Sequence, residues 1–527
     1  MQGDHSNSTR RRAAGSRRLL CLLAAATSRF LSAVVAVCAA WPLLAAEPVK
    51  PDAPVQQQQP LDQLNTSELK RIKTVEANFP ELALRQGMLE CVVELRFTVL
   101  PDGSTADIEI MHSEPVPLFA LFEESAIRAV KQWRYEPVIR NGQPVAQGTE
   151  VAIRFTGKKT AFPVTYGDPI DPVSAASMES VLRRDLDQAL SNGVLSASSP
   201  IGIAIGIVHD DDRRVFTFGK AKPDAIFEIG SITKTFTGLL LALAIEQGEV
   251  KIDTPVRELL PPDTVAKPAT GSEIMLLDLV TQHSGLPRMP DNFDPKDPSN
   301  PYADYDSTRL YEFLRAHGVA KPALPEFLYS NLGFGLLGQA LANHAHTDYP
   351  ALLKRSVLNP FGMRETAITL DADQQRRFIQ GHDADCRPVP AWDLTALAGA
   401  GGLRSTAADM LRYLEANLRQ RATDAETTSD GRRLAAALAR SQTLQADADG
   451  TLKIGYAWMY DAATETYQHS GATGGYSSFA FFSPKRNYAG IVLANVTLSP
   501  RGRFAETVGK HIGARFAGEK PISLRDW

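Results

Sequence analysis

The alternation of apolar and polar residues predicts paired β-strands at both ends of a long C-terminal region. Residues 201–208 and 214–218 flank an acidic turn, and residues 479–482 and 489–496 flank another polar turn, so each pair is expected to form a hairpin. Mostly helical sequence lies between the hairpins, including an apolar run at 233–245 that suits a buried helix. The pattern predicts an antiparallel sheet built from both ends of the region, with an inserted helical subdomain and a cleft between them.

A second, smaller α+β pattern precedes this region. Residues 91–99 and 106–111 alternate on either side of Pro101-Asp102-Gly103, which predicts a hairpin. A last strand pair, 135–139 and 145–155, brackets Asn141-Gly142. Apolar residues between the hairpin and this pair recur at helical spacing: Phe122, Ala126, Val130 and Trp133. We interpret this stripe as the buried face of a helix that packs on a small core.

Composition divides the chain into five segments. A basic stretch followed by an apolar run marks an export signal, either cleaved as a signal peptide or retained as an N-terminal anchor. Two proline-rich stretches, the first also rich in glutamine, are typical of linkers. An amphipathic helix from Met178 to Leu190, ending at Asn192-Gly193, opens the last segment. The predicted segments are the signal or anchor 1–46, a linker 47–65, a small domain 66–157, a linker 158–175 and the C-terminal domain 176–520.

Charge and cysteine content narrow the possible partners and compartment. The chain of 527 residues carries a formal net charge of -4, and this charge becomes more negative once the basic export segment is removed. The sequence therefore shows no basic face of the kind that binds nucleic acid. Two of the four cysteines leave with that segment. Cys91 and Cys386 fall in different predicted domains, and a disulfide between them stays open. No metal or cofactor motif appears, and the expected chemistry needs neither.

Ser231-Ile232-Thr233-Lys234 is the first candidate for chemistry. Because a helix repeats every 3.6 residues, Ser231 and Lys234 lie on one helical face and can contact each other. The free N–H groups at the helix start favour developing negative charge. A serine hydroxyl is a weak nucleophile without a base, and a lysine serves as that base only when burial or nearby positive charge keeps it partly neutral.

Two later tripeptides supply the proton relay, the amide and the substrate-binding strand that the first motif lacks. Tyr329 offers a phenol that can relay a proton to a leaving group, and Asn331 offers an amide that can hold Lys234 and a substrate carbonyl. His469-Ser470-Gly471 precedes two glycines and an alternating apolar run, which predicts the opening of an edge strand. Such a strand can pair with substrate backbone and lend an N–H group to an oxyanion hole.

A second His-Ser-Gly tripeptide stands at His283-Ser284-Gly285. It follows the helical run 274–280 and precedes Leu286-Pro287, which is typical of a helix that ends in a turn. It also comes before Tyr329 in the chain, whereas the other copy comes after it. We therefore interpret the first copy as structural and the second copy as part of the site.

The region 201–496 resembles the class C β-lactamase and serine DD-peptidase family. The resemblance rests on the three motifs and on the flanking stretches Gln282-His283-Ser284-Gly285-Leu286-Pro287 and Gly401-Gly402-Leu403-Arg404-Ser405-Thr406. It implies a β-lactamase/transpeptidase-like fold, acylation of the serine, and proton handling by the lysine and tyrosine. It also implies an oxyanion hole from the N–H groups of Ser231 and Ala472. The resulting site comprises the catalytic residues Ser231, Lys234, Tyr329 and Asn331, and the substrate-binding or oxyanion residues His469, Ser470, Gly471 and Ala472.

One departure from that family pattern bears on the substrate. Class C β-lactamases usually carry lysine where this chain has His469, and a histidine is mostly neutral at pH 7. The departure favours a penicillin-binding D-Ala-D-Ala carboxypeptidase or endopeptidase acting on cell-wall peptides. A class C-type β-lactamase, and an esterase or D-aminopeptidase of the same fold, remain alternatives. A non-enzymatic binding or scaffold protein is the alternative from another class.

The small domain resembles the C-terminal domain of TonB. The residues that carry this resemblance are Asn78-Phe79-Pro80, Pro101-Asp102-Gly103, Ala129-Val130 and the run from Trp133 through Pro137. The resemblance implies periplasmic protein binding, with strand addition as the usual mode. Because a hydrolase-like region follows, we expect a docking or positioning module with a periplasmic or outer-membrane partner. The export segment and the cell-wall chemistry both indicate the periplasm, with inner-membrane anchoring if the segment is retained.

Overall fold

The computed structural model describes most of the two predicted domains. The described residues are 69–77, 90–114, 119–156, 171–323, 325–420, 428–497 and 504–524. The predicted export segment and the first linker lie outside these residues, as does the second linker up to residue 170. Within the described ranges, every helix is too short or too polar to cross a bilayer.

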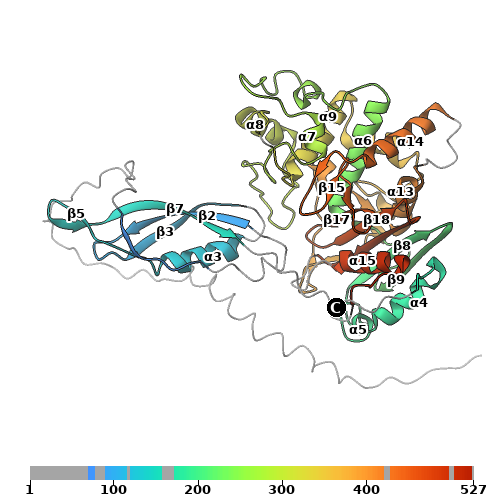
Figure 1. Ribbon diagram of the computed structural model, residues 1–527, viewed down its shortest axis with the longest axis horizontal. Helices are drawn as coiled ribbons and strands as arrows, with labels where there is room; N and C mark the ends of the chain where they lie inside the picture. The colour runs from blue at the N-terminus through green and yellow to red at the C-terminus, as the bar shows by residue number, and fades with distance from the viewer. Residues whose placement is uncertain are drawn as a thin grey trace, which may run out of the picture. The chain divides into compact units, whose positions relative to one another are not determined.

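An eight-stranded antiparallel sheet forms the centre of the larger unit, with the strand order β14-β15-β16-β17-β18-β19-β8-β9 (Figure 1). Strands from the two ends of the region lie side by side, because β8 pairs with β19 along its length. Both predicted hairpins, β8 with β9 and β18 with β19, are confirmed. The strands are β8 Gly202–His209, β9 Asp212–Gly219, β14 Ala446–Asp447, β15 Lys453–Ile454, β16 Met459–Asp461, β17 Thr466–Ala472, β18 Ser477–Ser483 and β19 Tyr488–Ala494.

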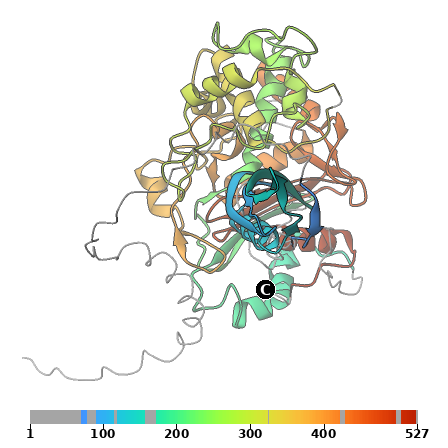
Figure 2. The same cartoon turned by 90° about the vertical axis from the view of Figure 1, so that its left-hand side faces the viewer.

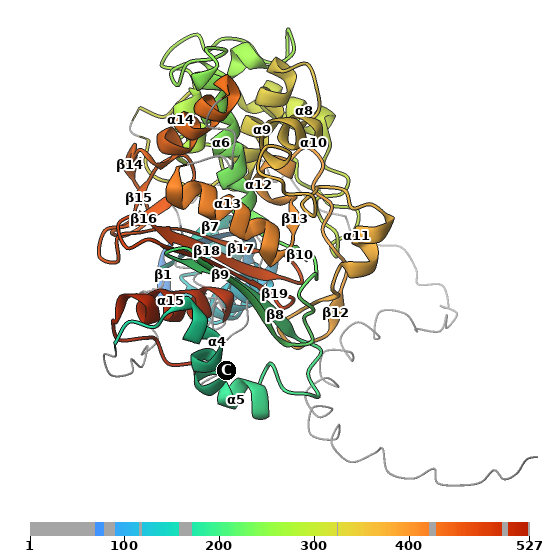
Figure 3. The same cartoon turned by 90° about the vertical axis from the view of Figure 1, so that its right-hand side faces the viewer.

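Helices cover both faces of this sheet, as Figure 3 shows. Alternate residues of β8 point to opposite faces: Ile203 and Ile205 join the apolar cluster under α15 (Phe504–Ala517), whereas Ala204 joins the cluster around α6 (Thr233–Glu246) and α13 (Ala407–Arg419). A strand buried on both faces needs apolar residues at every position, which explains the continuous apolar sequence of β8. The alternating pattern therefore gives way to a continuous apolar run in this interior strand.

The predicted amphipathic helix before β8 is interrupted. It forms two helices, α4 (Ala175–Asp185) and α5 (Asp187–Ser191), because Leu186 leaves the helical conformation with φ of -94° and ψ of 11°. Both pack beneath the sheet on the side of α15 (Figure 3). The apolar spacing continues across Leu186, which remains fully buried, so periodicity alone did not reveal the break.

The inserted helical layer carries short elements that position the site (Figures 1 and 2). A short pair of strands, β10 (Phe227–Glu228) and β13 (Arg404–Ser405), ties its two ends together next to α6. The remaining elements are η2 Gly230–Ile232, η3 Val256–Leu259, α7 Leu276–Val280, α8 Ser307–His317, α9 Asn331–His344, α10 Tyr349–Leu353, η4 Lys354–Leu358, α11 Ala372–Arg377, β11 Gly381–His382, β12 Pro388–Val389, α12 Ala398–Gly401 and α14 Ser429–Gln442.

The smaller unit is a three-stranded antiparallel sheet with one helix on it. The central strand β2 (Glu90–Val99) pairs with β3 (Thr105–Glu114) and with β7 (Gln147–Thr156), and α3 (Phe119–Val130) covers the face of its odd-numbered residues. The predicted stripe Phe122, Ala126, Val130 and Trp133 is buried in this core, as expected. Figure 2 views the blue and teal strands of this unit nearly end on.

One expectation about the smaller unit needs correction. Residues 145–155 are not one strand paired across Asn141-Gly142: β5 (Val138–Arg140) pairs with β6 (Gln143–Val145), while β7 pairs with β2. Only the residues nearest the turn form the hairpin of β5 and β6. Strand β7 instead completes the three-stranded sheet with β2 and β3. Cys91 and Cys386 are both free thiols in the structure, and Cys91 is buried in the core of the smaller unit.

Candidate active site

Ser231 lies in a tight turn that leads into a buried helix. The turn is η2, and α6 begins two residues later at Thr233, so the serine precedes the helix rather than starting it. Gly230 has a φ of +50°, and a Cβ atom at this position would lie 2.7 Å from the backbone nitrogen of Ala472. Glycine therefore allows the Ser231 turn and the end of strand β17 to lie in direct contact.

Lys234 connects the serine to two other segments. Its side chain is 0% exposed, and its Nζ atom lies 3.1 Å from Ser231 Oγ. The same Nζ atom donates to Asn331 Oδ1 at 2.8 Å and to the backbone oxygen of Ala400 at 2.7 Å. The spacing of three residues predicted the contact with Ser231, and the structure also brings Asn331 to the same nitrogen.

The surroundings of Lys234 favour a neutral amine. Burial lowers the pKa of Lys234 well below its ordinary value, and the positive charge of Arg288 lowers the pKa further. A neutral amine has two N–H groups and one lone pair. In that neutral form the oxygen atoms of Asn331 and Ala400, which can only accept, would take the two N–H groups and leave the lone pair toward Ser231 Oγ. This is the geometry of a base beside a hydroxyl.

Tyr329 and Asn331 are held by the start of helix α9. Ser330 caps this helix, since its hydroxyl accepts from the backbone N–H of Gly333 at 2.8 Å and donates to the backbone oxygen of Pro287 at 2.6 Å. The capped start places Asn331 against Lys234, and the centroid of the Tyr329 ring lies 4.8 Å from Lys234 Nζ. The tripeptide therefore puts a phenol and an amide beside the lysine, with the serine between them serving as a cap.

The first His-Ser-Gly tripeptide braces this helix start. It forms the predicted turn after α7, with positive φ values at Gln282 (65°) and Gly285 (74°). The side chain of Gln282 accepts from the backbone N–H of Ser330 at 2.7 Å, and its backbone oxygen accepts from the N–H of Leu328 at 2.8 Å. The copy is structural, as predicted, and it supports the loop that carries Tyr329.

The second tripeptide lies in strand β17. All of β17 from Tyr467 to Ala472 pairs with β18, whereas β16 pairs only with Thr466, Tyr467 and Gln468. Among the described strands, residues 469–472 therefore have a neighbour on one side alone. The expectation that the motif opens an edge strand is wrong in position: it occupies the second half of β17, and the edge is local because β16 is short.

The end of β17 packs tightly on the segment that carries Ser231. A Cβ atom at Gly471 would lie 2.1 Å from the backbone oxygen of Ile229, and the Ser478 hydroxyl donates to that same oxygen at 2.8 Å. His469 is buried, with 5% of its surface exposed, and its Nδ1 atom lies 2.7 Å from the backbone oxygen of Ser470. That carbonyl only accepts, so Nδ1 carries the proton. Ser470 and Ala472 are half-buried on the other side of the strand.

Sequence reasoning missed two groups at the site. The backbone oxygen of Ala400 accepts from Lys234, but a carbonyl leaves no side-chain signal in a sequence. Arg288 directly follows the Gln282–Pro287 stretch, and its guanidinium carbon lies 5.1 Å from the centroid of the Tyr329 ring. A charged residue adjoining a motif was a visible signal for Arg288.

A buried ion pair supports the strand side of the site. Glu228 Oε1 accepts from the backbone N–H of Trp392 at 2.8 Å and lies 3.5 Å from Arg404 Nη2, which also donates to Asp393 at 2.9 Å. Burial raises the pKa of Glu228 despite the nearby Arg404. Together these contacts fix Trp392, whose indole nitrogen would lie 2.7 Å from a Cβ atom at Gly474.

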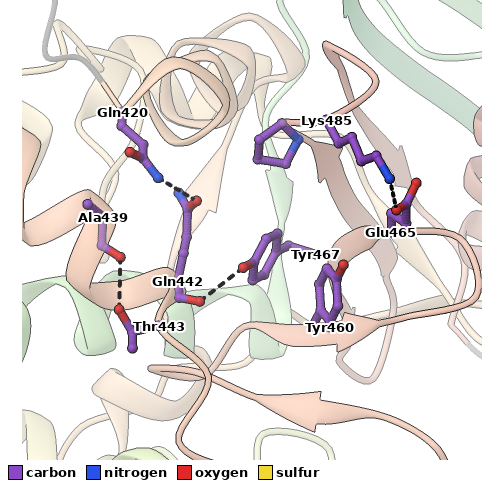
Figure 4. Close-up of a pocket in the computed structure, with 9 residues that line it drawn as sticks. Gln420, Ala439, Gln442, Thr443, Tyr460, Glu465, Tyr467 and Lys485 are labelled. Atoms are coloured by element: carbon purple, nitrogen blue, oxygen red, sulfur yellow. Dashed lines mark hydrogen bonds and ion pairs between the residues drawn. The ribbon is translucent and has the colours of Figure 1, made fainter.

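A separate pocket, shown in Figure 4, lies toward the start of β17. Its polar side chains bond to one another: Gln420 donates to Gln442 at 3.2 Å, the Tyr467 hydroxyl donates to the backbone oxygen of Gln442 at 3.0 Å, and Lys485 pairs with Glu465. None of the predicted site residues lines this pocket. The candidate active site is at Ser231, where the Lys234 amine meets Asn331 and the Ala400 carbonyl.

Comparison with known proteins identifies the family. The Beta-lactamase family model matches residues 192–513, which is more than half of the chain. The chain therefore belongs to the β-lactamase-related family of serine hydrolases, as its motifs predicted. The family model of the Gram-negative bacterial TonB protein C-terminal domain matches residues 75–156, which confirms the second resemblance.

Individual relatives agree with this assignment. The D-alanyl-D-alanine-carboxypeptidase/endopeptidase AmpH of Escherichia coli K12 is 28% identical over 361 residues, covering 64% of this chain and 91% of the relative. A Beta-lactamase of the same organism is 26% identical over 337 residues, covering 56% and 84%. A solved class C beta-lactamase superposes with a TM-score of 0.53 at 20% identity, over 65% of this chain and 98% of that protein. The last match confirms the predicted fold.

Proposed function

We propose that this chain is a periplasmic hydrolase that forms an acyl-enzyme on Ser231 and cleaves D-Ala-D-Ala type peptides of the cell wall. The observation that carries the proposal is the triple contact of the buried Lys234 amine with Ser231 Oγ, Asn331 Oδ1 and the backbone oxygen of Ala400. An amine whose pKa is lowered by burial, with its lone pair facing a hydroxyl, can activate that hydroxyl at neutral pH.

Acylation would proceed through proton transfer to Lys234. As Ser231 Oγ attacks the substrate carbonyl carbon, the lone pair of Lys234 takes the hydroxyl proton. The N–H groups of Ser231 and Ala472 stabilise the oxyanion, which the close approach of Gly230 to Ala472 makes feasible. Tyr329 relays the proton to the leaving amine as the carbon–nitrogen bond breaks. Water then attacks the ester, which releases the acid and restores the hydroxyl.

Two observations favour a peptide substrate over a β-lactam. His469 stands where class C β-lactamases carry lysine, and it is buried with Nδ1 held by a backbone carbonyl rather than offered as a fixed positive charge. The relative AmpH, named a D-alanyl-D-alanine-carboxypeptidase/endopeptidase, aligns over 91% of its length. The β-lactamase alternative is supported by the Beta-lactamase relatives. An esterase or D-aminopeptidase would share the nucleophile, whereas a scaffold would not need the Lys234 contacts.

Steady-state rates on three substrates test the preference. Purified protein lacking residues 1–46 is assayed with a D-Ala-D-Ala peptide, with nitrocefin and with a short acyl ester. We expect the highest kcat/KM on the peptide. A nitrocefin rate far above the peptide rate would identify a β-lactamase, and a dominant ester rate would identify an esterase.

We further propose that the TonB-like domain docks the enzyme to a periplasmic or outer-membrane protein. The outer strands of its sheet, β3 and β7, are the sites at which strand addition would occur. Deletion of residues 66–157 tests this role, with circular dichroism as a control for folding. Loss of envelope association at unchanged peptide hydrolysis would support docking, whereas loss of hydrolysis would show that the domain helps to build the site.

A further inference from the structure

Arg288 places a permanent positive charge beside the catalytic groups. Its side chain is exposed, and its guanidinium carbon lies 5.1 Å from the centroid of the Tyr329 ring. The other end of the residue is fixed, because its backbone oxygen accepts from the N–H groups of Asn331 at 3.0 Å and Leu332 at 3.2 Å. The cation is therefore held at the start of helix α9, over the ring that also faces Lys234.

The charge of Arg288 is not neutralised within the described part of the chain. No carboxylate there forms an ion pair with it, and its guanidinium contacts the Tyr329 ring instead. An arginine stays protonated at all physiological pH values, whereas burial lowers the pKa of Lys234 well below its ordinary value. Its field reaches the site centre, since Arg288 is the one charged residue that contributes to the lowered pKa of Lys234.

The opposite wall of the site offers no comparable fixed charge at its motif. His469 on β17 is buried and uses Nδ1 for a backbone carbonyl. A guanidinium presents a planar fork of N–H donors that matches a carboxylate in two parallel hydrogen bonds. A substrate lying between β17 and α9 would thus meet this fork on the α9 side.

We propose that Arg288 binds a carboxylate of the substrate and makes the enzyme prefer anionic over neutral substrates. The inference rests on the proposed function, because it names the charge of the substrate that reaches Ser231. The cation–π contact with the Tyr329 ring orients the guanidinium, so Arg288 is a specificity-determining residue beside helix α9.

Binding measurements on a variant that cannot hydrolyse its ligand test this inference separately from the hydrolysis. In the Ser231→Ala full chain, calorimetry measures the Kd of N-succinyl-D-Ala-D-Ala and of its succinyl methyl ester, which differ in charge at the acyl end. N-acetyl-D-Ala-D-Ala and its C-terminal amide differ in charge at the leaving end. Comparison of the two pairs shows whether Arg288 binds a carboxylate at the acyl end or at the leaving end of the ligand.

In at least one pair, we expect the ligand with the additional carboxylate to bind about tenfold more tightly, as for a charge-assisted pair of hydrogen bonds. Arg288→Gln in the same background should remove that ratio without changing the Kd of the ligand in that pair that lacks the additional carboxylate, and Arg288→Lys should retain part of it. Arg315→Gln, at an exposed arginine of α8, is the matched control and should preserve the ratio.

Equal Kd values within both pairs, or a ratio that survives Arg288→Gln, would overturn the inference. Circular dichroism of each variant checks that the fold is intact. Hydrolysis of the two ligands that lack the additional carboxylate, by the protein with Ser231 intact, reports separately on the proposed function. Failure of that hydrolysis with a charge ratio present would contradict the activity and leave Arg288 as an anion-binding residue.

Discussion

The chain contains the tripeptide His-Ser-Gly twice, and the two copies adopt different structures. His283-Ser284-Gly285 forms a turn after α7 that holds the loop before α9, whereas His469-Ser470-Gly471 forms the half of β17 that packs on the Ser231 segment. One copy supports the wall that carries Tyr329 and Asn331, and the other copy is the opposite wall itself.

The two copies have the same three residues, so their different structures arise from the elements on either side of them. Gln282 and Gly285 adopt positive φ values after a helix, so that copy turns back on itself. The second copy pairs with β18 through every residue and keeps one side without a strand neighbour among the described residues. A short motif therefore becomes informative when the elements on both sides of it are predicted first.

The two glycines give the largest expected contrast. Gly471→Ala should lower the acylation rate about a hundredfold, because its Cβ would meet the backbone oxygen of Ile229 at 2.1 Å and displace β17 from the serine. Gly285→Ala should instead lower the free energy of unfolding by about 1–3 kcal/mol, because its φ is +74° and its Cβ would meet the ring of Pro322. Acylation kinetics and thermal melts measure both effects. A larger loss of activity in Gly285→Ala would contradict the assignment of the two walls.

The two histidines test the argument about charge. His469→Lys should raise kcat/KM for nitrocefin about tenfold, because a lysine supplies a fixed charge for the carboxylate of the β-lactam. His283→Lys should leave this value unchanged, since His283 lies in the turn with Nδ1 bonded to the backbone oxygen of Thr281. An unchanged nitrocefin rate in His469→Lys would remove the histidine from the argument about substrate class.

The two serines give the smallest expected contrast. Ser470→Ala should lower kcat/KM about fivefold at unchanged stability, as for the loss of one neutral hydrogen bond to substrate from a half-buried residue. Ser284→Ala should cost about 1 kcal/mol of unfolding free energy at unchanged kcat/KM, because its buried hydroxyl accepts from the N–H of Leu286. Urea melts and peptide kinetics on both variants separate the two outcomes, and a swap of the two effects would reverse the assignment.

Local patterns predicted the sheet and the side-chain motifs well. The alternating strands, the apolar run of α6 and the spacing of Ser231 and Lys234 are properties of short stretches, so they are readable in one sequence. The break at Leu186 and the short β16 were not readable, because they depend on how distant elements fit. The contact of Lys234 with the Ala400 carbonyl was also beyond reach, since every residue carries a carbonyl.

Arg288 shows a different kind of omission. The residue adjoins a recognised stretch, but its importance depends on the Tyr329 ring, which lies 41 positions further along the chain. Arg288 became a candidate determinant of specificity only when the structure showed its contact with the Tyr329 ring. The roles of Ser231, Lys234, Tyr329 and Asn331 in catalysis remain predictions that the geometry supports.

The pH dependence of acylation at Ser231 tests the central claim most directly. A labelled penicillin is mixed with the protein, and mass spectrometry follows the adduct on the Ser231 peptide across a pH series. Because burial and Arg288 lower the pKa of Lys234, the neutral amine forms at lower pH than for a free lysine. The rate should rise with pH and level off well below the ordinary lysine pKa of about 10.4, and Lys234→Met should abolish the rise. Label on another peptide, or undiminished labelling of Ser231→Ala, would contradict the account.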